Sequence, residues 1–242
     1  MRIKPSKLYQ FAYENGALLN GTPRGIVLQF IGLNGNTRMI TEDPWEAQLY
    51  ADRGILFVIP YINPWSWMNR ASVKLTDGVV DCLFEKYALP EGTPIVSTGG
   101  SMGGLCALTY AAYAKRTPAA VAANCPVCDL PYHYTERDDL PRTLLSAFGE
   151  YGLPLDEAMK TASPLHLAEK MPDVPYFIAH CEKDQAVNKE KHSDRLVALL
   201  KKTRDVSYCE VPERGHCDLA PEAKELWYGF IFKACDEKDP RP

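Results

Sequence analysis

The 242-residue sequence lacks three features that would each have assigned it to a broad class of protein. It contains no apolar run long enough to cross a bilayer, so no membrane-spanning helix and no membrane partner are predicted. It has no excess of basic residues, and its formal net charge of −4 argues against nucleic acid as a partner. Its N-terminus lacks the apolar core of a signal peptide, and we therefore expect a cytoplasmic protein.

The sequence also shows no internal repeat, no linker and no shift in composition that would divide the chain. A chain of 242 residues is long enough to bury one large core. We therefore predict a single domain over residues 1–242 and leave its oligomeric state open.

Eight cysteines are present, and without an export signal we expect reduced thiols rather than disulfides. Cys125-Pro-Val-Cys128 is a C-x-x-C motif, but it follows a predicted strand and no second ligand pair accompanies it in the sequence. We therefore predict buried packing residues there and no metal site. Cys181 and Cys217 are interpreted as packing residues at the rim of the candidate site.

Apolar segments that predict strands alternate along the chain with segments that predict helices. Strands are predicted at residues 25–31, 54–59, 94–98, 119–123, 175–180 and 206–211, and helices at residues 44–53, 72–87, 105–116, 189–202 and 221–235. This alternation favours a mostly parallel, twisted α/β sheet with helices on both faces. Residues 8–13 and 17–19 predict a β-hairpin, and residues 129–171 predict a short cap segment with one or two helices.

The strongest chemical signal is the run Gly99-Gly100-Ser101-Met102-Gly103-Gly104, between a predicted strand and a predicted helix. This is the context of a G-x-S-x-G nucleophile elbow, a turn so tight that glycine is needed on both sides of a strained serine. A flexible glycine loop is the simpler alternative. The spacing is not G-x-G-x-x-G and no Gly-Lys-Ser/Thr follows, which argues against a phosphate-binding loop. Ser101 is therefore the predicted nucleophile.

A serine hydroxyl needs a base to become a nucleophile. Of the five histidines, His216 is predicted in the loop after the last strand, at the carboxyl edge of the sheet where Ser101 also lies. The other four fit less well: the cap segment holds His133 and His166, a strand ends at His180, and the solvent side of a charged helix is predicted for His192.

The base in turn needs an orienting acid, which should also follow a strand. Asp184 lies in the turn after the strand at residues 175–180, while Glu182 and Asp173 are alternatives and helix capping is the simpler interpretation. The chain order Ser101, Asp184, His216 is the order found in α/β-hydrolases.

These motifs together resemble a known family. The Gly-Gly-Ser-Met-Gly-Gly run, Ser163-Pro-Leu, His180-x-x-x-Asp184-x-x-Val187 and Gly215-His216 are similar to the catalytic domain of the prolyl-oligopeptidase and acetyl-xylan-esterase branch, from about residue 25 onward. The resemblance implies an α/β-hydrolase fold with a minimal cap. It also implies an oxyanion hole made by the amides of Met102 and Leu33, or Asn34 one register off, although Ile31-Gly32 replaces the more usual His-Gly.

The same resemblance implies a Ser-His-Asp serine hydrolase that works through an acyl-enzyme without a cofactor. Peptidases of this branch carry a β-propeller before the hydrolase domain, for which the chain has no room. We therefore expect a small-molecule ester substrate with a small-acyl, aryl or sugar group of the acetyl or feruloyl type. Asn34, Trp65 and Trp67 are candidate substrate-binding residues, although both tryptophans are equally expected to pack their loop.

Two other functions stay open at this point. One is a small oligopeptidase or acyl-aminoacyl hydrolase. The other is a hydrolase fold used for binding without turnover.

Overall fold

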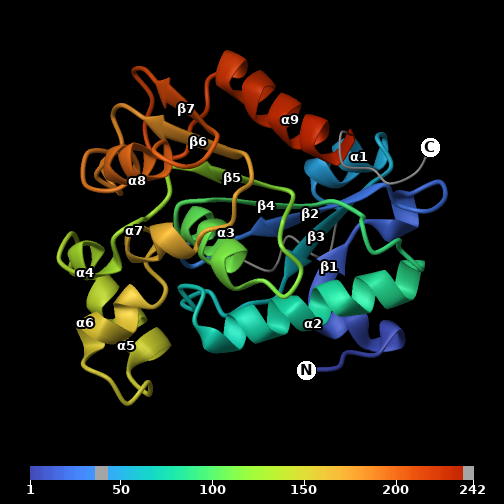
Figure 1. Ribbon diagram of the computed structural model, residues 1–242, viewed down its shortest axis with the longest axis horizontal. Coiled ribbons are helices and arrows are strands. Elements are labelled where there is room, and N and C mark those ends of the chain that lie inside the picture. Colours follow the sequence, from blue (N-terminus) through green and yellow to red (C-terminus); the bar gives the residue numbers. More distant parts are fainter. Residues whose placement is uncertain (36–42, 237–242) are drawn as a thin grey trace.

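The computed structural model describes residues 1–35 and 43–236, which form a seven-stranded sheet with helices on both faces (Figure 1). The strand order is β1-β3-β2-β4-β5-β6-β7, and every pair is parallel except β1 with β3. This arrangement confirms the α/β-hydrolase fold predicted from the sequence. The strands are β1 (Ala12–Glu14), β2 (Gly25–Phe30), β3 (Ile55–Pro60), β4 (Ile95–Gly100), β5 (Ala120–Asn124), β6 (Tyr176–Cys181) and β7 (Val206–Val211).

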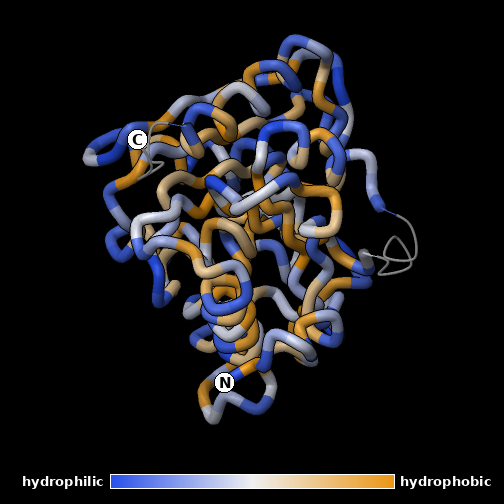
Figure 2. Tube along the Cα trace, turned by 90° about the vertical axis from the view of Figure 1, so that its right-hand side faces the viewer, coloured by the Kyte–Doolittle hydropathy of each residue, from blue (hydrophilic) through white to orange (hydrophobic). Residues whose placement is uncertain are grey.

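The two faces of the sheet are covered by different helices (Figure 1). The apolar side chains of α2 (Arg70–Tyr87), α3 (Met102–Tyr113) and α8 (Ser193–Leu200) bury one face, and those of α1 (Trp45–Ala51) and α9 (Pro221–Asp236) bury the other. The central strands are buried on both sides, which is why they read as continuous apolar runs. Hydrophobic segments accordingly gather inside the molecule and hydrophilic ones in its outer loops (Figure 2).

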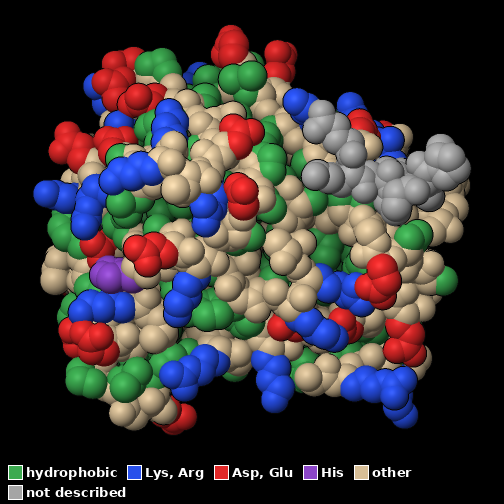
Figure 3. Space-filling model, in the orientation of Figure 1, with side chains coloured by type: hydrophobic (Ala, Val, Ile, Leu, Met, Phe, Trp, Pro, Cys, Tyr) green, Lys and Arg blue, Asp and Glu red, His purple; other side chains and the backbone are tan. Residues whose placement is uncertain are grey.

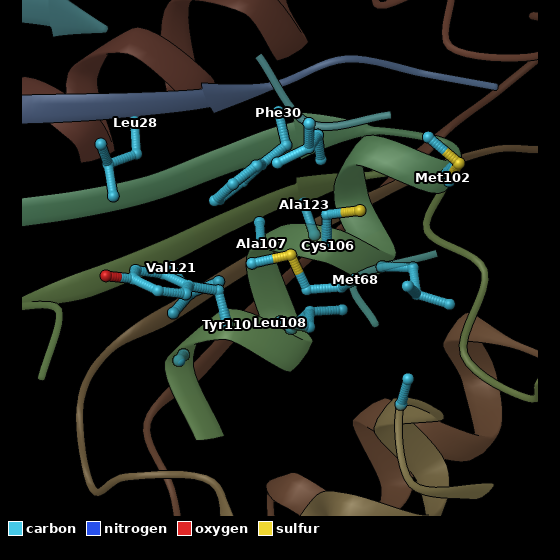
Figure 4. Close-up of a cluster of buried hydrophobic side chains, with 14 of the residues drawn as sticks. Leu28, Phe30, Met68, Met102, Cys106, Ala107, Leu108, Tyr110, Val121 and Ala123 are labelled. Carbon is cyan, nitrogen blue, oxygen red and sulfur yellow. The ribbon is translucent and has the colours of Figure 1, made fainter. Parts of the chain in front are cut away.

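The core directly beneath the candidate site is formed by β2 and α3 (Figure 4). Phe30 and Tyr110 pack with ring centroids 5.8 Å apart, and Met102 and Cys106 are fully buried beside them. Because α3 is buried on nearly every side, its sequence is rich in alanine and leucine rather than amphipathic. The start of α3 is therefore held on a rigid base.

The segment between β5 and β6 forms a small cap, as predicted, but with four short helices rather than one or two. They are α4 (Leu130–His133), α5 (Leu140–Phe148), α6 (Leu155–Lys160) and α7 (Pro164–Leu167). Hydrogen bonds join this cap to the body: Trp67 Nε1 donates to Thr143 Oγ1 at 3.0 Å, and Thr109 Oγ1 donates to the carbonyl of Ala162 at 2.8 Å. The cap is thus fastened to the loop before α2 and to α3.

The predicted N-terminal hairpin is wrong. Residues Pro5–Gln10 and Gly16–Leu18 form 3₁₀ helices, and β1 pairs with β3 rather than with a second N-terminal strand. The reason is Asn15, which is 1% exposed: its Oδ1 accepts the N–H of Phe57 at 2.8 Å and its Nδ2 donates to the carbonyl of Ala47 at 2.8 Å. This side chain binds β3 and α1, so the chain at Asn15 is not free to form a two-residue hairpin turn.

No helix in the described part of the chain is long and apolar enough to cross a bilayer. On the face shown in Figure 3, acidic and basic side chains are interspersed, in keeping with the small net charge.

Candidate active site

Ser101 stands in the tight turn between β4 and α3, and its backbone has the strained geometry that a nucleophile elbow requires. Its φ is 58° and its ψ is −125°, a region that residues with a side chain seldom adopt. A Cβ added at Gly103 would overlap the carbonyl of Phe30, and one added at Gly99 would overlap Gly103 itself. Glycine is therefore the residue that these two positions accommodate, as the G-x-S-x-G pattern predicts.

Asp184 and His216 come together from the loops after β6 and β7. His216 Nδ1 donates to Asp184 Oδ2 at 2.7 Å, and Asp184 Oδ1 accepts the N–H groups of Ala186 at 2.8 Å and Val187 at 3.0 Å. Burial raises the pKa of Asp184, but hydrogen bonds from His180, His216 and the Val187 amide outweigh burial and hold this pKa well below its usual range. The carboxylate is therefore ionised and fixed in orientation.

The charge of this carboxylate acts on the imidazole. Burial lowers the pKa of His216, but the hydrogen bond to Asp184, the neighbouring Cys125 sulfur and the negative charge of Asp184 more than offset it and raise this pKa to about 9. The two alternative acids lie elsewhere: Glu182 is at the surface beside Lys183, and Asp173 precedes β6 on the opposite edge of the sheet. Of the three carboxylates, Asp184 is the one that contacts His216.

Ser101 and His216 line the same cavity, whose volume is about 540 Å³. Within the described residues, no hydrogen bond joins Ser101 Oγ to His216 Nε2. The Nε2 atom instead faces Cys217 Sγ at 3.7 Å. The rest of the lining is mostly apolar, with three glycines and a few polar side chains. It consists of Phe30, Ile31, Leu33, Pro44, Phe57, Ile59, Gly32, Gly35, Gly100, Gln29, Asn34, Glu46, Arg137 and Cys217. A cavity of this size and polarity is typical of small-molecule sites.

The loop after β2 passes directly beside the elbow. A Cβ added at Gly32 would lie 3.9 Å from the Cβ of Ser101. The N–H of Asn34 is engaged with the carbonyl of Pro64 at 3.4 Å, whereas no hydrogen bond within the described residues occupies the N–H of Leu33. Met102 begins α3, so its N–H belongs to the first turn, where N–H groups have no partner within the helix.

The predicted substrate-binding residues lie in different environments. Asn34 lines the cavity, and its Oδ1 accepts Trp65 Nε1 at 2.5 Å. Neither Trp65 nor Trp67 belongs to the cavity lining. Trp65 is partly exposed under the guanidinium of Arg142, while Trp67 is 1% exposed and packs edge-on against His133. Trp67 therefore packs its loop against the cap and is not accessible to a ligand.

The expectation that His192 faces solvent is wrong, because the helix begins only at Ser193 and His192 is completely buried. Its Nδ1 accepts the N–H groups of Cys128 and Asp129 at 3.0 and 3.1 Å, and its Nε2 donates to Glu136 Oε2 at 2.8 Å. This histidine thereby connects α8 to the cap, a role that its charged sequence neighbours conceal.

Sequence reasoning also missed the residues that surround the acid and the base. His180 is completely buried, and its Nε2 lies 3.3 Å from Asp184 Oδ2, the oxygen that His216 also contacts. The thiol of Cys125 lies beside His216 and Cys217. The four-residue spacing of His180 and Asp184 could have indicated their contact. Nothing in the sequence indicates that Cys125 lies beside His216.

A model of the prolyl oligopeptidase family matches residues 76–236, which include Ser101, Asp184 and His216. No curated protein matches the chain.

Solved structures with the same fold include esterases and peptidases. Esterase B from Lactobacillus rhamnosis is 14% identical with a TM-score of 0.69, covering 90% of this chain and 78% of that one. The Porphyromonas gingivalis dipeptidyl peptidase 4 is 15% identical with a TM-score of 0.68, covering 94% of this chain and 33% of that one. The Pyrococcus horikoshii acylaminoacyl peptidase is 15% identical with a TM-score of 0.67, covering 92% and 38%.

At these identities the structural likeness shows the fold, and this chain spans only about a third of each peptidase. The family match carries more, because it covers four of the seven strands, β4 to β7, and with them the loops that hold Ser101, Asp184 and His216. The chain is therefore a serine hydrolase that belongs to the prolyl oligopeptidase family, as its motifs predicted.

Proposed function

We propose that this protein hydrolyses carboxylic esters with Ser101, His216 and Asp184 as a catalytic triad. The observation that carries the proposal is the 2.7 Å hydrogen bond from His216 Nδ1 to the buried Asp184, in a loop that shares its cavity with the strained Ser101. An imidazole oriented in this way keeps the lone pair on Nε2, the nitrogen that a serine hydroxyl requires as its base.

The reaction follows from this arrangement in two halves. Ser101 Oγ attacks the ester carbonyl while its proton passes to His216 Nε2, and the negative charge of Asp184 stabilises the imidazolium that forms. His216 then returns the proton to the departing alkoxide, which leaves an acyl-enzyme. Water, deprotonated by the same nitrogen, attacks the acyl-enzyme and releases the acid and free Ser101.

The oxyanion of each tetrahedral intermediate needs preorganised donors. We assign these to the N–H groups of Met102 and Leu33, because the Asn34 N–H is already engaged with Pro64. Asn34 is then part of the cavity wall, and its backbone N–H is not an oxyanion-hole donor.

We expect an ester rather than a peptide as the substrate. Its apolar walls and its volume of about 540 Å³ suit a small acyl or aryl group. An alkoxide also needs less help from an acid than an amine does. Acetylated or feruloylated sugars remain within this class if the sugar lies outside the apolar part of the cavity.

The test is hydrolysis of p-nitrophenyl acetate, butyrate and octanoate, together with covalent labelling of the nucleophile by a fluorophosphonate. The wild type should turn over at least one ester, and Ser101→Ala should lower kcat by at least ~10⁴ and abolish labelling. Ser146→Ala, an exposed serine of α5, is the matched control and should change neither measurement.

Each result that contradicts the proposal points elsewhere. Labelling of Ser101 without ester turnover would exclude a general esterase and direct the search to acyl-aminoacyl and short peptide substrates. A folded protein with neither labelling nor turnover would contradict the triad and favour a binding function.

A further inference from the structure

Three side chains with metal-ligating atoms meet at the inner wall of the catalytic cavity. A ring nitrogen of His216 and the Sγ atoms of Cys125 and Cys217 all lie within 4.8 Å of one another. The Cys217 sulfur is 3.7 Å from His216 Nε2. In a tetrahedral zinc site, bond lengths of about 2.3 Å to sulfur and about 2.0 Å to nitrogen place those two atoms about 3.5 Å apart. The observed spacing is already close to one edge of such a site.

His216 presents the correct nitrogen for a metal. Its Nδ1–H is donated to Asp184, so in the neutral ring the lone pair is on Nε2, the atom that faces Cys217. A carboxylate bound to the far nitrogen is also the usual outer partner of a zinc-binding histidine, because it fixes the tautomer and the ring orientation. The hydrogen bond that makes His216 a base thus also makes it a metal ligand.

The surroundings of Cys125 suit a metal-bound thiolate. Its Sγ accepts the backbone N–H groups of Cys181 at 3.3 Å and Cys217 at 3.4 Å, and such donors stabilise negative charge on sulfur. The neighbouring Cys217 thiol raises the pKa of Cys125 and burial adds to this, so an ion must displace the thiol proton when it binds.

Access to this group is from the cavity. Cys125 is completely buried, whereas Cys217 and His216 are partly exposed and line the cavity. An ion entering from the cavity meets these two ligands first and Cys125 behind them, and its fourth coordination position is left toward the cavity.

Two other groups of ligating side chains in the described part of the chain do not offer this combination. In the group of His133, Glu136 and His192, the Nδ1 of His192 accepts two backbone N–H groups and its Nε2–H is donated to Glu136. The second group consists of Cys125, His180 and Asp184. There the Nε2 of His180 faces the carbonyl of Val187 and therefore carries a proton. Neither His192 nor His180 has a lone pair directed at the other members of its group, and the Nδ1 of His133, the third histidine, is hydrogen-bonded to Glu136 Oε2.

We propose that Cys125, Cys217 and His216 bind one thiophilic divalent cation, zinc foremost, and that this ion regulates the enzyme by occupying the base. A metal on Nε2 removes the lone pair that would accept the proton of Ser101, so zinc is a reversible inhibitor. The inhibition rests on the proposed function, whereas the binding site itself does not.

The experiment measures metal binding directly. The full-length protein, kept reduced with a phosphine, is titrated with cobalt chloride and the thiolate-to-cobalt charge-transfer absorption is followed; zinc chloride is then added to displace the cobalt. We expect one cobalt per chain, with a charge-transfer band that zinc abolishes. Cys217→Ser and Cys125→Ser should each weaken binding by more than the ~10–100-fold that loss of an outer partner costs.

The matched control is Cys209→Ser, which alters a partly exposed thiol of β7 outside the cluster and should keep the band. Cys217 is partly exposed, so its substitution should leave the fold intact even if that of the buried Cys125 does not; a thermal unfolding curve of each variant checks this.

The proposal is overturned if the wild type shows no thiolate-to-cobalt band, or if the band persists in folded Cys217→Ser. Because binding is read without turnover, this result is separate from the test of ester hydrolysis. A protein that binds cobalt but cleaves no ester contradicts the proposed function alone, and an active esterase that binds no cobalt contradicts the zinc site alone.

Discussion

Replacing Asp184 by asparagine tests how the acid acts, and the structure predicts the outcome in detail. Asp184 Oδ1 accepts two backbone N–H groups, from Ala186 and Val187. The amide oxygen of an asparagine must take that place, since its NH₂ cannot accept them. The NH₂ would then face His216 Nδ1 and force this nitrogen to accept a hydrogen bond. The ring proton moves to Nε2, and His216 can no longer take the proton of Ser101.

The magnitude has two parts. The pKa of His216 is raised to about 9 from an ordinary 6.5, chiefly by Asp184 and in part by Cys125. The whole shift corresponds to about 3 kcal/mol in favour of the imidazolium at 1.36 kcal/mol per pKa unit, which is an upper bound for the share of Asp184. The His216 side chain is 29% exposed, so solvent screens part of this. Its loss alone would slow the reaction by about 10²-fold. The wrong tautomer adds to it, and we expect kcat to fall by ~10⁴ in total, the size of effect that a misoriented imidazole has in other triads.

The assay is kcat/KM for p-nitrophenyl acetate from about pH 5 to about pH 10, together with the rate of fluorophosphonate labelling. Wild-type kcat/KM should rise with pH toward about 9, because only the neutral imidazole accepts a proton. Glu182→Gln and Asp173→Asn alter the two alternative acids and should leave the profile unchanged. The reasoning is refuted if Asp184→Asn stays within tenfold of the wild type, or if Glu182→Gln falls as far.

Two further predictions concern stability. Gly103→Ala should unfold the protein or lower its free energy of unfolding by at least ~3 kcal/mol, because the new methyl overlaps the Phe30 carbonyl. Gly229→Ala in α9 meets nothing within 4 Å and should raise the free energy of unfolding by up to ~1 kcal/mol. Chemical denaturation of both variants measures these changes. Burial raises the pKa of Glu136, but hydrogen bonds from His133 and His192 outweigh this and lower it to about 2. Its contribution to stability is therefore complete above its ordinary pKa of 4.5 and is lost as the pH falls toward 2. At neutral pH, thermal unfolding should show Glu136→Gln to be less stable than the wild type by about 1–3 kcal/mol, and this difference should shrink in acid. The control Glu157→Gln alters an exposed carboxylate and should show no such pH-dependent loss of stability.

The sequence-based predictions that proved wrong involve side chains whose contacts cannot be inferred from their neighbours in the chain. Asn15 sits in a typical hairpin turn sequence, yet it binds β3 and α1 through its side chain and the hairpin does not form. His192 lies among charged residues, yet hydrogen bonds to Glu136 and to the segment after β5 keep it buried. In both cases the partner is more than 25 residues away, beyond the reach of any local pattern.

The sequence by itself determined the layered α/β fold and the three residues of the candidate triad. Buried parallel strands must be apolar along their whole length, a nucleophile elbow must have glycine at fixed positions, and loops after parallel strands must meet at one edge of the sheet. Each of these requirements is local or topological, so it can be recognised from the amino-acid sequence alone. Ser101, Asp184 and His216 could be named for that reason, and the structure brings Asp184 and His216 into contact and Ser101 into the same cavity.

Only the tertiary structure decided what surrounds them. It buried Trp67 beneath the cap, placed His180 against Asp184 and brought Cys125 to the edge of His216, 92 residues before the cysteine that follows that histidine. These contacts depend on how side chains from separate elements fill the space between them, and periodicity along one element carries no information about that packing.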